Sequence, residues 1–205
     1  SGTAAFNESV AISRDALRYN VPGAGHATFA MRTDMAPFDN PDLRLALKYA
    51  IDREEIVQKI LLGHGIVAND HPIAPVMPYA AKLEQRPYDP EKAKFHLQKS
   101  GLSNVSISLS AGDAAFPGSV EMGLLFRETL SRIGVNLEVV REATDGYWSN
   151  VWMKKPFVVV HTGQRPTPDI VFSLFYRRGA PWNDTGWDND RFQTLLVEAK
   201  AELDQ

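Results

Sequence analysis

The residues best suited to bind a ligand follow the apolar run at residues 157–160. They are His161, Thr162, Gly163, Gln164 and Arg165. A continuous apolar run is typical of a strand buried on both faces, and ligands of open α/β sheets bind beyond the carboxyl ends of the strands. Arg165 is the strongest candidate, because a guanidinium binds a carboxylate or phosphate with two parallel hydrogen bonds and keeps its charge. The alternative is a surface arginine paired with Asp169.

Aromatic residues and one amide form a second group of candidates, because aromatic faces with polar tips suit the walls of ligand sites. These candidates are Tyr147, Trp148, Trp182 and Asn183. The alternative for Trp148 is core packing, since Trp148 and Trp152 would share one face of a helix. Trp182 and Asn183 follow a loop at residues 179–181 and are predicted to lie at the rim of a cleft.

The residue types that most enzymes use are not combined here in a recognisable pattern. The 205-residue chain has no cysteine, and its five histidines show no metal-ligand spacing. No phosphate-binding glycine loop or nucleophile elbow occurs in the sequence. We therefore predict a binding protein without cofactor or metal. The alternative is a hydrolase built around Asp113, His161 or Asp169.

The composition is that of an ordinary globular domain, with 44% apolar and 23% charged residues. No apolar run approaches the ~20 residues of a membrane span. The net charge of −3 and the scattered basic residues give no electrostatic footprint for nucleic acid. A chain of this length can form one core without disulfides, so we predict a single domain over residues 1–205.

Three helix starts can be identified from local sequence. Asn40 precedes Pro41, Asp89 precedes Pro90, and Asp52 opens a variant of the capping box. In each case a side-chain oxygen can accept the free amide hydrogens of the first helical turn. Capping therefore explains these polar residues without a chemical role.

A strand at 105–109, a long helix at 116–133 and a strand at 135–140 predict a βαβ unit with parallel strands. The predicted fold class is α/β, with a mixed, mostly parallel sheet flanked by helices. The other expected elements are a short helix over 6–19, a loop at 21–25, a strand over 27–33, a Pro-rich segment at about 65–88 that wraps a surface, a helix over 144–153, a strand over 156–160 and a last helix over 189–203.

Four short segments carry a resemblance to a known family. They are Pro37-Phe38-Asp39, Ala50-Ile51-Asp52-Arg53, Tyr88-Asp89-Pro90-Glu91-Lys92-Ala93 and Trp187-Asp188-Asn189-Asp190-Arg191-Phe192. From about Thr28 onward the chain resembles the family 5 extracellular solute-binding proteins of ABC importers for peptides, nickel and opines. The resemblance implies one lobe, the second, of a two-lobed type II periplasmic-binding-protein fold. In that family the loop corresponding to 161–169 contacts bound peptide.

The same resemblance implies partners and a location. The partners are a peptide or small solute, the missing first lobe of the same polypeptide and ABC permease subunits in the membrane. The location is periplasmic, with an export signal upstream of this sequence. Oligopeptide binders place an acidic residue in the loop where this chain has Gln164 and Arg165, a departure from ordinary peptide specificity. The alternative function is an effector-sensing domain of a transcription regulator.

Overall fold

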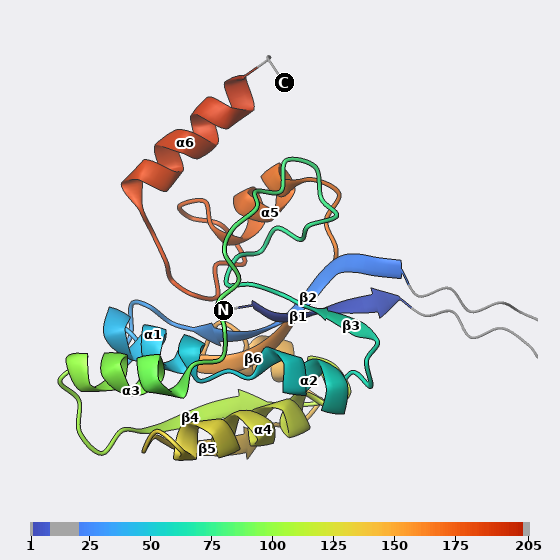
Figure 1. The fold of residues 1–205 in the computed structure, drawn as a ribbon. Coiled ribbons are helices and arrows are strands. Elements are labelled where there is room, and N and C mark those ends of the chain that lie inside the picture. Colours follow the sequence, from blue (N-terminus) through green and yellow to red (C-terminus); the bar gives the residue numbers. More distant parts are fainter. Residues whose placement is uncertain (1, 9–20, 203–205) are drawn as a thin grey trace, which may run out of the picture.

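The computed structural model describes residues 2–8 and 21–202 and contains a six-stranded sheet with helices on both faces (Figure 1). The strands are β1 (Gly2–Glu8), β2 (Val21–Met31), β3 (Gly65–Val67), β4 (Ser106–Ala111), β5 (Asn136–Arg141) and β6 (Phe157–Thr162). The helices are α1 (Pro41–Tyr49), α2 (Arg53–Lys59), α3 (Pro90–Lys99), α4 (Ser119–Ser131), the π-helical turn η1 (Tyr147–Val151), α5 (Pro168–Phe175) and α6 (Asp190–Ala201).

The strand order in the sheet is β3-β1-β2-β6-β4-β5. Strand β4 pairs in parallel with β5 and with β6, which confirms the predicted βαβ unit of β4, α4 and β5. Strand β2 pairs antiparallel with β6 and with β1, and β1 pairs antiparallel with β3. The predicted α/β class with a mixed sheet is therefore confirmed, and β6 lies in its middle.

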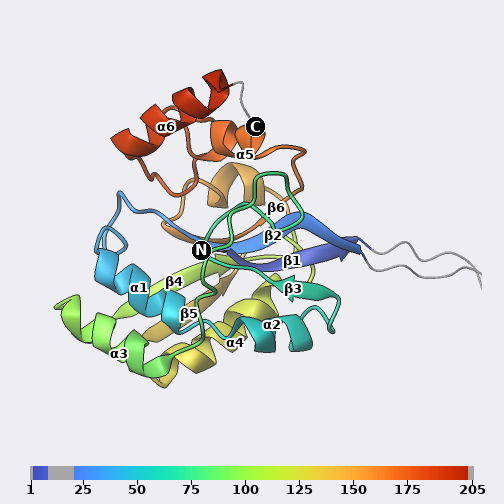
Figure 2. The same cartoon turned by 45° about the horizontal axis from the view of Figure 1, so that its top comes forward.

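Different parts of the chain cover the two faces of the sheet (Figures 1 and 2). Helices α1 to α4 lie on one side, and α5 lies on the other side with the Pro-rich segment. In the larger core, Phe126 of α4 stacks on Phe29 of β2 with a ring-centroid distance of 4.8 Å. A smaller cluster joins Ile73 and Met77 of the Pro-rich segment to Phe175 of α5.

The three predicted helix caps are confirmed. The side chains of Asn40, Asp52 and Asp89 accept hydrogen bonds from first-turn amides at 2.9 to 3.1 Å. These polar side chains are occupied in starting α1, α2 and α3, as expected from their positions.

The segment at 21–25, which we expected to be a loop, is instead the start of β2. Its residues pair with β1, where Val21 lies opposite Glu8 and Pro22 opposite Asn7 beside a register irregularity. Pairing with a neighbouring strand has overridden the local loop composition. Of the short helix expected over 6–19, residues 6–8 belong to β1, and residues 9–20 lie outside the described residues.

The helix predicted over 144–153 is reduced to the single π-helical turn η1. Gly146 has a φ of 76° immediately before this turn, and Met153 has a φ of 59° shortly after it. Both values lie in the left-handed region, which a right-handed helix cannot continue through. The apolar spacing indicated a helix, but the backbone ends it on both sides.

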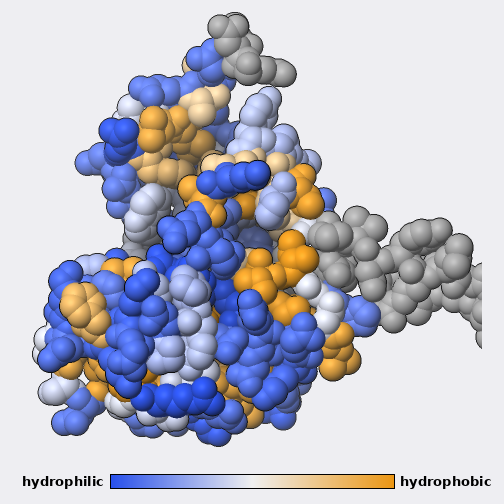
Figure 3. Space-filling view, viewed as in Figure 1, coloured by the Kyte–Doolittle hydropathy of each residue, from blue (hydrophilic) through white to orange (hydrophobic). Residues whose placement is uncertain are grey.

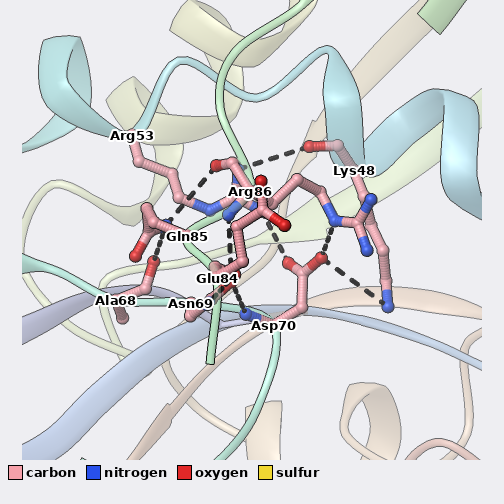
Figure 4. A network of polar contacts seen from close by, with 8 residues as sticks. All are labelled: Lys48, Arg53, Ala68, Asn69, Asp70, Glu84, Gln85 and Arg86. Carbon is pink, nitrogen blue, oxygen red and sulfur yellow. Dashed lines mark hydrogen bonds and ion pairs between the residues drawn. The ribbon is translucent and has the colours of Figure 1, made fainter. Parts of the chain in front are cut away.

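The Pro-rich segment has neither helix nor strand from residue 68 to 89. Its two ends lie side by side (Figure 4). The Asn69 amide donates to the Glu84 carbonyl at 2.8 Å, and the Gln85 amide donates to the Ala68 carbonyl at 3.2 Å. These contacts close the segment into a loop whose middle reaches α5 through Ile73.

Asp70 connects the base of this loop to α1 and α2 through Lys48 and Arg53 (Figure 4). Its carboxylate accepts from the Arg53 guanidinium at 2.6 Å and from Arg86, and the Lys48 ammonium lies 4.0 Å away. The Arg53 side chain is only 2% exposed and that of Asp70 11%. Burial opposes the charged carboxylate, but positive charges that include Lys48, Arg53 and Arg86 favour it, and the pKa of Asp70 lies below its usual range.

No helix in the described part of the chain is long and apolar enough to cross a membrane.

Candidate ligand-binding site

The loop after β6 is fixed against strand β2. Residues 157–160 are buried, and His161 and Thr162 are half-buried at the end of the strand. The Ala24 amide donates to the Gln164 side-chain oxygen at 3.4 Å. The His161 ring lies against Gly25, where an added Cβ would be 3.4 Å from Nε2. Burial lowers the pKa of His161, which favours the neutral ring.

One edge of the Arg165 guanidinium is held by hydrogen bonds, and the donors of the other edge are available to a ligand. Nη1 donates to the carbonyls of Gly163 and Gln164, both at 2.9 Å. The guanidinium lies 5.4 Å from the centroid of the Trp182 ring and 6.0 Å from that of Phe175. Nε and Nη2 have no hydrogen-bond partner among the residues that the structure describes. This edge of the guanidinium is the one that binds a carboxylate with two parallel hydrogen bonds.

The predicted alternative, an ion pair between Arg165 and Asp169, is wrong. Asp169 pairs with Lys200 at 3.1 Å and accepts from the Ser173 hydroxyl at 3.2 Å. Asp169 also lies in the first turn of α5, which Thr167 caps. Its role is structural, and the positive charge of Arg165 is not neutralised by it.

The predicted aromatic candidates form a row of edge-to-face contacts. The ring-centroid distances are 6.3 Å between Trp182 and Trp152, 5.7 Å between Trp152 and Trp148, and 5.5 Å between Trp148 and Tyr147. Trp148 is 46% exposed, so the core alternative is wrong for this residue. The row joins Trp148 to the ring on which Arg165 stacks.

Tyr147 is a core residue, and the prediction that it lines a ligand wall is wrong. Its side chain is fully buried, and its hydroxyl donates to the Val159 carbonyl at 2.7 Å. Burial raises its pKa far above the usual tyrosine range. A ring that large fills the space beside Gly112, where an added Cβ would lie 3.2 Å from it. The helical spacing could not show which way this ring points.

Asn183 shapes the loop that carries Trp182. Its amide donates to the Trp187 carbonyl at 2.9 Å, and its oxygen accepts from the Thr185 hydroxyl at 3.0 Å. Both functional ends of the side chain are therefore used within the loop. A direct contact with a ligand is not supported for Asn183.

Asp184 is a polar residue of the site that the sequence analysis missed. Its Oδ2 accepts from the Trp152 indole at 3.0 Å, and it lines a small cavity of about 20 Å³ with Thr162 and Tyr176. Burial raises the pKa of Asp184, and the Trp152 hydrogen bond opposes this shift. The sequence position of Asp184 between Trp182 and Trp187 could have suggested a role in the site. The burial of its side chain cannot be inferred from that position.

The side chains gathered at this loop offer hydrogen-bond donors and aromatic faces to a ligand. No group of three or more His, Cys, Asp or Glu side chains in the described residues could hold a metal ion. What the loop offers is one unoccupied guanidinium edge, half-buried hydroxyl and imidazole groups, and an aromatic wall. These features suit an anionic or polar organic solute.

Comparisons with known proteins agree with this description. A model of the bacterial extracellular solute-binding proteins, family 5 Middle, matches residues 3–184. Heme-binding protein A of Haemophilus influenzae is 40% identical over 83 residues, which are 40% of this chain and 15% of that protein. Oligopeptide-binding protein OppA of Bacillus subtilis is 24% identical over 95% of this chain and 38% of its own length. The chain thus spans well under half the length of these curated relatives.

Solved structures with the same fold include HbpA2 from Haemophilus parasuis, with a TM-score of 0.79 at 24% identity over 89% of this chain and 38% of that one. Another is DppA from Helicobacter pylori in complex with the peptide STSA, with a TM-score of 0.80 at 20% identity over 89% of this chain and 37% of that one. They confirm the predicted fold of the type II periplasmic binding proteins. Because the family model covers most of the chain, the chain belongs to family 5 of the bacterial extracellular solute-binding proteins.

Proposed function

We propose that the chain is the ligand-binding second lobe of a two-lobed solute-binding protein that delivers a peptide or related polar solute to an ABC importer. The observation that carries this proposal is the unoccupied edge of Arg165, stacked over Trp182 at the carboxyl end of β6. The membership of family 5 supports the class of function. The relatives reported above are solute-binding proteins, and nothing in them favours the transcription-regulator alternative.

The mechanism that we propose is hinge closure. A ligand held by both lobes stabilises the closed state by its higher affinity for that state. In this lobe we assign the polar contacts with the ligand to the loop 161–165. We assign the aromatic wall of the site to Trp148 and Trp182. The other lobe of the same polypeptide would supply the opposite wall, and the closed form would dock on permease subunits from the periplasm.

Replacing Arg165 by alanine in the full-length protein is expected to weaken the binding of an anionic ligand by about 2 kcal/mol or more, because a desolvated charge pair is lost. The measurement is a calorimetric titration with the solute that is released when the purified full-length protein is unfolded. Arg165→Lys is expected to recover only part of the affinity, since an ammonium cannot form the two parallel hydrogen bonds.

The matched control is Arg127→Ala, which removes an exposed arginine from α4 on the other side of the sheet (Figure 1). It should leave the affinity within a factor of two of the wild type. Equal affinities for the wild type and Arg165→Ala would contradict the assignment of Arg165.

A further inference from the structure

A second depression lies between α1 and the aromatic side of α5. Its volume is about 330 Å³, and neither the loop 161–165 nor Trp182 lines it. Figure 3 shows a recess between the upper part of the molecule, where α6 lies in Figure 1, and the lower body that carries α1. Arg165 therefore lies outside this groove, while Tyr176 lines both the groove and the small cavity beside Thr162.

Lys48 of α1 places a positive charge on one wall of the groove, at the outer limit of an ion pair with Asp70. The nearest carboxylate to its ammonium is Asp70 at 4.0 Å, beyond hydrogen-bond distance. No residue in the described part of the chain accepts a hydrogen bond from the ammonium, although the side chain is only 24% exposed. Burial lowers the pKa of Lys48, and a bound anion would oppose that effect.

The charges around Lys48 do not balance. Asp70 is the acidic residue that lines the groove, and Arg53 and Arg86 already occupy its oxygens from behind. Among the described residues that line the groove, Lys48 and Arg44 are positive and Asp70 is negative, so positive charge is in excess. Such an excess in a partly desolvated pocket attracts an anion.

Arg44 stands one helical turn before Lys48 on α1 and lines the same groove. Its Nη1 donates to the Phe38 carbonyl at 2.5 Å, while Nε and Nη2 have no partner among the described residues. Asp39, whose charge acts on Arg44, is exposed and does not line the groove. Arg44 thus adds a second set of available donors.

The facing wall is aromatic. Its four rings meet edge to face or nearly so, at centroid distances of 5.2 to 6.4 Å. They are Phe172, Tyr176, Trp187 and Phe192. A wall of this kind binds an apolar or aromatic body, and a cationic wall opposite it binds an acidic group.

We propose that this groove is a second ligand site, which binds an organic anion through Lys48 and Arg44 and packs the apolar body of that anion against the aromatic wall. The ligand class is a carboxylate or a phosphate ester with an apolar or aromatic body. Either acid group can accept hydrogen bonds from an ammonium and a guanidinium.

The test uses the full-length protein and three probes, namely 3-phenylpropionate, phenyl phosphate and the neutral 3-phenylpropionamide. Binding is followed by nuclear magnetic resonance titration. At least one acidic probe is expected to bind about tenfold or more tightly than the amide. Whichever of the two acidic probes binds more tightly shows whether the groove prefers a carboxylate or a phosphate ester. Lys48→Gln is expected to lower the affinity for that probe about tenfold or more, while Lys48→Arg should keep the affinity within about threefold of the wild type.

Lys154→Gln is the matched control, because Lys154 is exposed and lies outside the groove. This variant should bind the acid as the wild type does. The proposal is overturned if no acid binds, if the amide binds as tightly as the acid, or if Lys48→Gln has no effect. A loss of acid binding in Arg165→Ala alone would also overturn it, because the acid would then occupy the other site.

Discussion

Replacing Asp70 by alanine is expected to lower the free energy of unfolding by about 3 to 5 kcal/mol, because it leaves buried cations without their counter-charge. The guanidinium of Arg53 is almost fully buried and depends on this carboxylate. The loop base would lose Arg86 and Lys48 as partners at the same time. Urea unfolding of the wild type and the variant measures the difference.

The control for this prediction is Asp145→Ala, which removes an exposed carboxylate and should change the free energy of unfolding by less than about 0.5 kcal/mol. A loss below about 1 kcal/mol in Asp70→Ala would contradict the account of the ion cluster. That result would mean that the cations around position 70 are satisfied by solvent.

The stabilisation by Asp70 should also depend on pH. The pKa of this carboxyl is lowered in the folded protein, since burial is outweighed by positive charges that include Lys48, Arg53 and Arg86. The contribution is therefore complete above the ordinary carboxyl pKa of about 3.9 and disappears as the pH falls through the lower folded value. The difference between wild type and Asp70→Ala should be constant from pH 7 to about 5 and shrink below about 4.

Replacing Phe126 by alanine is the second large change, with an expected loss of about 3 to 5 kcal/mol. Its ring is 2% exposed and stacks on Phe29, so truncation leaves a cavity between α4 and the sheet. Phe95→Ala provides a matched control, because Phe95 is 59% exposed on α3. In the same urea unfolding experiment, the loss of unfolding free energy in Phe126→Ala should be at least three times that in Phe95→Ala. Similar losses in the two variants would show that the packing of α4 is not a main source of the stability of the sheet.

Features that depend on neighbours in sequence were predictable. The caps at Asn40, Asp52 and Asp89 are local, since each oxygen reaches amides two or three residues later. The unit of β4, α4 and β5 was predictable because strand alternation and helical spacing follow each other without interruption. The buried run of β6 likewise identified a central strand.

Features that depend on distant contacts were not predictable. The start of β2 exists because β1 pairs with it, and the local sequence of residues 21–25 favours a loop. Tyr147 and Trp148 are neighbours in sequence, yet one is buried beside Gly112 and the other is exposed. The charge of Asp70 is placed among cations from three separate segments, which no periodicity reveals.

The same division applies to the site. The position of Arg165 after β6 was inferred from a general rule about α/β sheets, and the edge of its guanidinium is open as a ligand contact requires. The roles of Asn183 and Asp184 could not be inferred, because they depend on which neighbours each side chain meets. Local sequence indicates where a site lies, while long-range packing decides which side chains remain available.

The most direct test of the proposed function is native mass spectrometry of the full-length protein purified from its own host. We expect a bound solute that carries an acidic group, released when the protein is unfolded. Its occupancy should fall strongly in Arg165→Ala and remain at the wild-type level in Arg127→Ala. A wild-type protein without any bound solute, or equal occupancy in Arg165→Ala, would contradict the proposal that this lobe holds its ligand through Arg165.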